Sequence, residues 1–179
     1  MDGDAGTQRR KEAPTRTRKD ELLEEFEQEM ATTRRVLERV PDEKGAWKPH
    51  EKSFSLEHLA QLVSWMPGWI GQTLRETSLD LAAEAGYSSE STETLVKGFD
   101  ENVASSRAAI RAVTADDWEV TWALRHGDRE LMRAPRWKVV RMHMSHLAHH
   151  RAQLGVYLRL LNVPVPSMYG PTADEGWSG

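Results

Sequence analysis

Apolar residues recur three and four positions apart in four segments of the chain, residues 17–40, 55–78, 91–113 and 135–161. This spacing places the apolar side chains of each segment on one face of a helix. Four amphipathic helices of similar length, joined by loops, are typical of a four-helix bundle. The pattern therefore predicts an all-α fold.

Residues at the ends of these segments agree with the helical pattern. Thr17 and Asp20 resemble a capping box at the start of the first helix. Ser55 and Ser91 are suited to cap the second and third helices, because a serine hydroxyl can accept a hydrogen bond from a free N–H of the first turn. Pro67 lies inside the second pattern, and we expect it to kink that helix because proline lacks an N–H.

Other segments depart from the helical pattern. Residues 118–124 alternate apolar and polar side chains before a turn at Gly127, which predicts a short hairpin or irregular segment just before the last helix. Residues 79–91 contain a glycine and several serines, which is typical of a loop. Residues 1–16 are polar and predict a disordered tail, so the folded domain would span residues 17–179.

Composition narrows the class of function. The chain has 179 residues, a net charge of -4 and no cysteine. The acidic balance argues against nucleic acid as a partner, and the missing cysteine excludes disulfides and thiolate catalysis. No apolar run reaches the roughly 18 residues that cross a bilayer, and the N-terminus lacks the apolar region of a signal peptide. We therefore expect a cytoplasmic protein that binds neither membranes nor nucleic acid.

Histidines crowd the last predicted helix, where four of the chain's seven lie between His143 and His150. Residues four apart are neighbours on a helix, so His146 and His150 could chelate one ion. A catalytic zinc site takes three protein ligands, so the third would have to come from another helix. The alternative is that these imidazoles serve as hydrogen-bonding groups inside the bundle.

Five stretches of the sequence resemble a known family. SHLAHHRAQL begins at Ser145 and is followed by VYLR at Val156 and by PVPSMYGPTADE at Pro164. WKPHEKSFSL begins at Trp47, and Pro67-Gly68-Trp69 follows it. These motifs resemble the DinB-like (damage-inducible, YfiT-like) family, over most of the chain beyond the N-terminal tail.

This resemblance implies a fold and a chemistry. The fold would be an up-down-down-up four-helix bundle, commonly a homodimer, in which three histidines hold a divalent ion. Family members with an assigned activity resemble thiol transferases or isomerases that use low-molecular-weight thiols. Here such a thiol would have to come from a cofactor or substrate, because the chain has no cysteine.

The resemblance carries over only two of the three metal ligands. His146 and His150 match, but the third ligand position, five residues before Pro67, is Leu62 in this chain. Trp65 stands where related chains often carry an acid.

His58 is the candidate replacement for the missing ligand, with zinc or nickel as the metal. It lies one turn before Leu62 on the same face, a displacement of about 6 Å along the axis. The ion would then have to move toward His150 and Gln153, since metal–nitrogen bonds leave little slack. The other possibility is that His58 packs or hydrogen-bonds at the wall of a cavity.

Two functions follow from these residues. The first is a divalent-metal-dependent enzyme, of thiol transferase, isomerase or hydrolase type, that acts on a small molecule through His146, His150 and His58. The second is a metal-free small-molecule-binding or structural dimeric bundle that has lost catalysis. In both, the expected ligand pocket is lined by Leu62, Trp65, Trp69, Gln153 and Tyr157.

Overall fold

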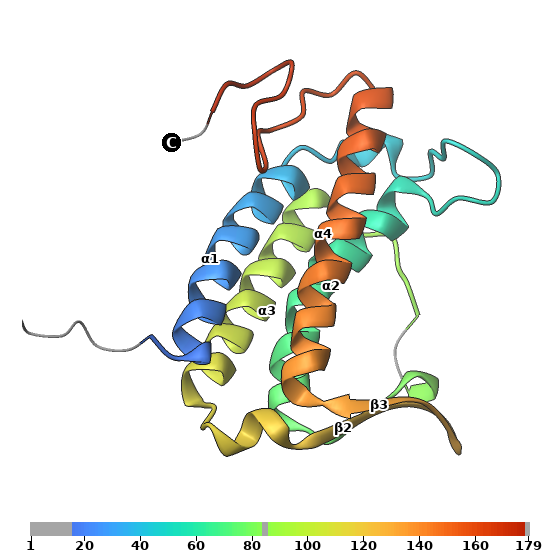
Figure 1. The fold of residues 1–179 in the computed structure, drawn as a ribbon. Coiled ribbons are helices and arrows are strands. Elements are labelled where there is room, and N and C mark those ends of the chain that lie inside the picture. Colours follow the sequence, from blue (N-terminus) through green and yellow to red (C-terminus); the bar gives the residue numbers. More distant parts are fainter. Residues whose placement is uncertain (1–15, 84–85, 178–179) are drawn as a thin grey trace, which may run out of the picture.

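The computed structural model describes residues 16–83 and 86–177. Within these ranges the long helices and strands follow the order α1 (Arg18–Leu37), α2 (Leu56–Arg75), β1 (Ser78–Asp80), α3 (Thr92–Ala112), β2 (Thr121–His126), β3 (Arg129–Pro135) and α4 (Arg136–Leu160). In Figure 1, α1 and α4 run upward and α2 and α3 run downward. None of these helices is long and apolar enough to cross a membrane. The disordered tail expected at residues 1–16 lies, apart from Arg16, outside the described residues.

Each of the first three helices begins at a side-chain cap, as the sequence predicts. The Thr17 hydroxyl accepts from the Asp20 N–H, and the Asp20 carboxylate accepts from the Thr17 N–H at 3.0 Å, which completes the capping box. Ser55 and Ser91 accept the N–H groups three residues onward in the same way. These contacts satisfy donors that a helix N-terminus would otherwise leave free.

α2 continues through Pro67, where the side chain of Ser106 from α3 hydrogen-bonds to its backbone. The Ser106 hydroxyl donates to the Pro67 carbonyl at 2.6 Å and accepts from the Gly71 N–H at 2.9 Å. A Cβ at Gly71 would lie 2.7 Å from that hydroxyl oxygen, so this close approach requires glycine. Ser106 therefore bonds two backbone groups that are one turn apart in α2.

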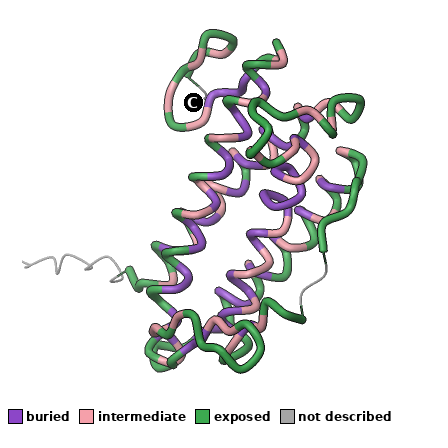
Figure 2. The backbone as a smooth tube through the Cα atoms, turned by 90° about the vertical axis from the view of Figure 1, so that its right-hand side faces the viewer, coloured by how far each residue is buried: buried purple, intermediate pink, exposed green. Residues whose placement is uncertain are grey.

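The core lies between the four helices. Figure 2 shows that buried residues follow the sides of the helices that face one another. α2 contributes the most buried residues, and α1, α3 and α4 each add an apolar stripe. Removing these side chains from water stabilises the fold by roughly 25 cal/mol per Å² of apolar surface.

The all-α fold class that the helical pattern predicts is wrong, because a three-stranded mixed sheet closes one end of the bundle. β2 pairs antiparallel with β3, and β1 pairs parallel with β2. Trp122 of β2 is buried and packs with Leu79 and Val139 in a second small core. The sheet therefore has its own apolar anchor on the first turn of α4 and belongs to the fold.

The sequence pattern does not predict strand β1, for a physical reason. β1 has three residues, Ser78–Asp80, which is too short to show the alternation that identifies a strand. Its partner, β2, lies far along the chain. A parallel pairing of this kind depends on tertiary contacts, which local sequence patterns do not contain.

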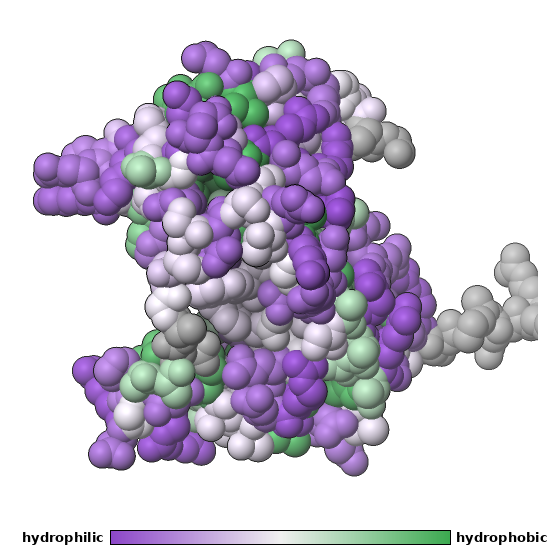
Figure 3. Space-filling view, turned by 180° about the vertical axis from the view of Figure 1, so that it is seen from behind, coloured by the Kyte–Doolittle hydropathy of each residue, from purple (hydrophilic) through white to green (hydrophobic). Residues whose placement is uncertain are grey.

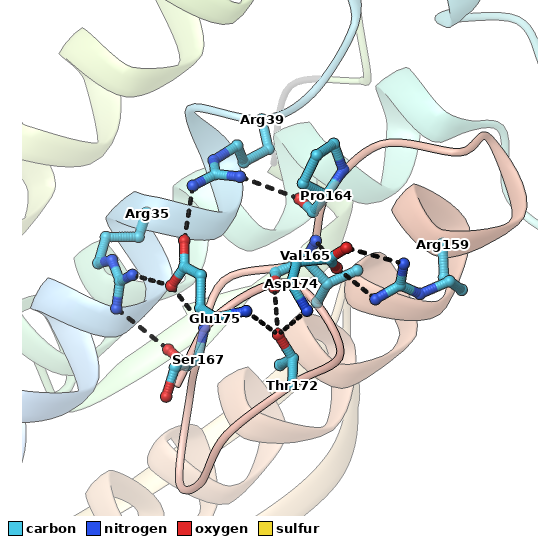
Figure 4. A network of polar contacts seen from close by, with 9 residues as sticks. All are labelled: Arg35, Arg39, Arg159, Pro164, Val165, Ser167, Thr172, Asp174 and Glu175. Carbon is cyan, nitrogen blue, oxygen red and sulfur yellow. Dashed lines mark hydrogen bonds and ion pairs between the residues drawn. The ribbon is translucent and has the colours of Figure 1, made fainter. Parts of the chain in front are cut away.

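The C-terminal segment, residues 163–177, folds back over the ends of α1 and α4 (Figure 4). The Glu175 carboxylate accepts hydrogen bonds from Arg35, from Arg39 at 2.8 Å and from the Ser167 N–H at 2.9 Å. Asp174 pairs with Arg159. The Ser167 N–H is the main cause of the lowered Glu175 pKa. These contacts fasten the segment to the bundle.

Candidate functional site

Hydrogen bonds link the polar side chains at the middle of α4, which we call the α4 histidine cluster (His146, His149, His150 and Gln153). The His150 Nδ1 lies 2.8 Å from the Gln153 Oε1. An amide oxygen only accepts, so His150 Nδ1 donates and its Nε2 is then an acceptor in the neutral ring. His146 Nε2 lies 2.9 Å from that nitrogen and donates to it. The Gln153 amide nitrogen donates to His149 Nε2 at 3.1 Å.

His146 and His150 are neutral near pH 7. Burial lowers the pKa of His146 below its usual value, and repulsion from His150 and His149 lowers it further. Burial also lowers the pKa of His150, although the hydrogen bond to Gln153 opposes this change. A neutral imidazole carries one donor and one acceptor, so the pair can hydrogen-bond without a counter-charge.

Trp69 of α2 packs against the histidines of α4. The centre of its ring lies 6.1 Å from that of His146 and 5.9 Å from that of His143. His143 is buried, and its Nε2 lies 3.2 Å from the Thr73 hydroxyl. Burial lowers the pKa of His143 to about 4. His143 is therefore a neutral group between α2 and α4, below the α4 histidine cluster.

His58 belongs to a stack of aromatic rings, which we call the aromatic stack (Phe54, His58, Tyr87 and Trp65). Its ring centre lies 4.2 Å from Phe54 and 3.6 Å from Tyr87. Tyr87 in turn stacks on Trp65 at 5.1 Å. Burial and the nearby Lys48 lower the pKa of His58. The structure thus places His58 among aromatic rings of α2, of the loop before α2 and of the loop before α3.

Three further residues expected in a ligand pocket, Leu62, Tyr157 and Gln153, each make contacts of their own. Leu62 is 5 % exposed and lies in the core. The Tyr157 hydroxyl donates to the Phe54 carbonyl at 3.3 Å, and its ring meets Trp47 edge-on. Gln153 is held by the two histidines described above.

Trp65 and Trp69 line an open pocket of about 340 Å³ between α2 and α3. The other residues around it are Gly68, Gln72, Arg75, Glu76 and Asn102. Figure 3 shows that the side of the molecule turned away in Figure 1 has a waist of intermediate hydropathy, whereas hydrophilic and hydrophobic side chains both occur at its two ends. Trp65 and Trp69 thus line this pocket and also contact other rings, Trp65 that of Tyr87 and Trp69 that of His146.

The residues present do not fit the three-histidine metal centre that the resemblance implies. Among the described side chains, no three from histidine, cysteine, aspartate and glutamate gather to hold an ion. His146 and His150 provide two nitrogens, but Leu62 provides no donor. His58 is engaged in the aromatic stack. Only two donors of the expected three are in place.

Two further residues shape this region, and the spacing of residues along the sequence does not predict the groups that they contact. Tyr87 lies in a loop outside every periodic pattern, so nothing local predicts that its ring stacks on His58. Arg151 is 1 % exposed and forms an ion pair between helices with Glu29 of α1. Its place directly after the paired histidines was the one signal that it faces the bundle.

Known proteins resemble the chain in sequence and in fold. The model of the DinB family matches residues 13–177. A DinB-like protein of Bacillus subtilis is similar in structure, with a TM-score of 0.65 and 16 % identity over 83 % of this chain and 96 % of the other. A DinB-like protein of Bacillus cereus ATCC 10987 gives 0.62 and 20 % identity over 82 % and 95 %. At these identities the two structures show a shared fold alone.

No curated protein matches the sequence. The family model, however, covers far more than half of the chain. The chain therefore belongs to the DinB family.

Proposed function

We propose that this DinB-family protein binds a small molecule between α2 and α4 without a metal ion. The observation that carries the proposal is the hydrogen-bonded His146–His150 pair, which the hydrogen bond to Gln153 holds in place. The third ligand position that the family resemblance implies is Leu62, which has no donor atom for a metal. In this reading the imidazoles are the polar end of a binding site. Trp69 of α2, whose ring packs against His143 and His146, supplies its apolar wall.

The chemistry of these groups indicates the kind of ligand. Small-molecule sites combine apolar and aromatic walls with a few polar groups that fix orientation. Neutral imidazoles favour a hydrogen-bonding group over a full charge, and indole rings bury a large apolar area. The ligand that fits is a small uncharged molecule with an apolar body and one hydrogen-bonding end.

Added metal should leave the stability of the protein unchanged. We expect the thermal midpoint of tag-free protein to be the same with Zn²⁺, Ni²⁺ or EDTA, because an ion that binds only the folded state would raise it. His146→Ala should be equally insensitive. A metal-dependent rise in the parent that His146→Ala loses would refute the proposal.

Leu62→His is the matched positive variant. It restores the third ligand that the family resemblance implies, so Zn²⁺ should now stabilise the protein, by about 2.7 kcal/mol at a hundred times the dissociation constant. Leu62→Asn is the control, since it adds a polar group at the same buried position without an imidazole. The stabilisation should disappear when His146→Ala is added to Leu62→His.

A metal-dependent transferase or hydrolase that uses a low-molecular-weight thiol is the second candidate. The observation that favours it is the 2.9 Å between the two Nε2 atoms. Two nitrogens bound to one ion at about 2.0–2.1 Å can lie at nearly this separation. Elemental analysis of tag-free protein decides between the candidates: a full equivalent of zinc or nickel supports the enzyme, and less than about a tenth of an equivalent excludes a tight site.

A further inference from the structure

Two rings on one face of α2 form the walls of a slot. His58 and Trp65 are seven residues apart, which is close to two turns of a helix and about 10.5 Å along its axis. Leu62 falls between them on the same face, where the family resemblance would place a metal ligand. The side chain that fills the space between the two walls is Tyr87, from the loop before α3.

We infer that the slot between His58 and Trp65 is a binding site for a planar aromatic ring, and that Tyr87 occupies it when no ligand is bound. This deepens the proposed function by naming the ligand class, and it rests on that function. The Tyr87 ring lies at 27° to His58 and at 18° to Trp65, so both of its faces are covered. A flat ring fits between such walls, whereas a puckered saturated ring does not.

Tyr87 enters the slot from the surface. Tyr87 is 45 % exposed to solvent, and no described residue hydrogen-bonds to its hydroxyl. A core tyrosine is normally buried further and has a partner for this group. The ring is thus held by its two stacking neighbours and by the loop that carries it.

The loop is tied to α2 by polar contacts that can exchange with water. The Gln61 amide donates to the Ser88 hydroxyl at 2.8 Å and accepts from the Ser88 N–H at 2.9 Å. The Ser89 hydroxyl donates to the Glu57 carboxylate at 2.8 Å. Release of these bonds would let Tyr87 withdraw and would leave the ring faces of His58 and Trp65 open on either side of the slot. A ligand ring that enters would replace one stacked ring with another.

The test uses the full-length protein with Tyr87→Ala, and 4-methylphenol as a probe that matches the tyrosine side chain. Titrations followed by calorimetry in the presence of EDTA should show saturable binding to Tyr87→Ala that is at least tenfold tighter than binding to the parent. Adding Trp65→Ala should abolish it. Trp177→Ala, which removes an exposed aromatic ring elsewhere, should bind no better than the parent.

Ser88→Ala provides a second variant that keeps the tyrosine. It weakens only the attachment of the loop, so it should also tighten binding of 4-methylphenol, by less than Tyr87→Ala. The slot is overturned if neither variant binds the probe more tightly than the parent. It is also overturned if cyclohexanol binds as well as 4-methylphenol, or if tetramethylammonium, which aromatic cages attract through its charge, binds more tightly.

The slot and the metal-free function fail in different ways. Suppose that 4-methylphenol binds in EDTA as expected, but that metal raises the thermal midpoint of the parent. That result would refute the metal-free function and support the slot. A midpoint insensitive to metal without any ring binding would refute the slot alone.

Discussion

Replacing Arg151 with methionine should lower the free energy of unfolding by about 3–5 kcal/mol, the usual cost of breaking a buried ion pair from one side. Arg151 is 1 % exposed, and its guanidinium lies 2.6 Å from the Glu29 carboxylate. It also donates to the Thr33 hydroxyl at 3.1 Å and to the Tyr169 hydroxyl at 2.7 Å. Methionine fills a similar volume but leaves Glu29 without its cation. Urea denaturation of both proteins measures the loss.

Two variants separate the buried charge from the lost packing. Adding Glu29→Leu to Arg151→Met should recover a large part of the stability, because no uncompensated charge then remains. Arg159→Met is the matched control at the surface. Arg159 pairs with Asp174 while 47 % of its side chain is exposed, so its loss should cost less than about 1 kcal/mol. Equal losses from Arg151→Met and Arg159→Met would contradict the expectation.

The helices could be predicted from the sequence because their signals are local. An apolar stripe and a capping residue such as Thr17, Ser55 or Ser91 act within one or two turns, and α1, α2 and α3 begin at these three caps. Strand β1 depends on a partner beyond α3, and no local pattern contains that partner. The burial of Arg151 likewise depends on a partner elsewhere in the fold, because the carboxylate that allows it comes from α1.

Part of the candidate site can likewise be predicted from local spacing, and part depends on contacts between distant segments. His146 and His150 meet because residues four apart on a helix are neighbours, which spacing alone predicts. The surroundings of His58 depend on which side chain fills the adjacent space. Tyr87 does so from a loop, and the spacing of residues on α2 holds no information about it. Spacing identifies residues that share a face, whereas the groups packed against that face come from elsewhere in the fold.

The stability of the protein should fall as the pH is lowered from about 6.5 to about 4, because of His143. In the unfolded chain this histidine takes up a proton near its ordinary pKa of 6.5, whereas in the folded protein burial lowers its pKa to about 4. Between these values the unfolded state binds more protons, so protonation favours unfolding. At 1.36 kcal/mol for each pKa unit, His143 contributes a loss of about 3 kcal/mol, complete near pH 4.

Other groups change stability over the same interval, so the measurement must isolate His143. The pKa values of His58, His146 and His150 are also lowered by burial, which adds to the loss. His143→Gln keeps a hydrogen-bonding partner for Thr73 and removes the titrating ring.

Urea denaturation at several pH values between 7.5 and 4 should therefore show a shallower fall in unfolding free energy for His143→Gln than for the parent. His126→Ala, at an exposed position, should follow the parent. If His143→Gln and the parent lose the same free energy over this interval, then His143 takes up its proton without unfolding the protein. In that case α2 and α4 must separate enough at low pH to admit water between Thr73 and His143.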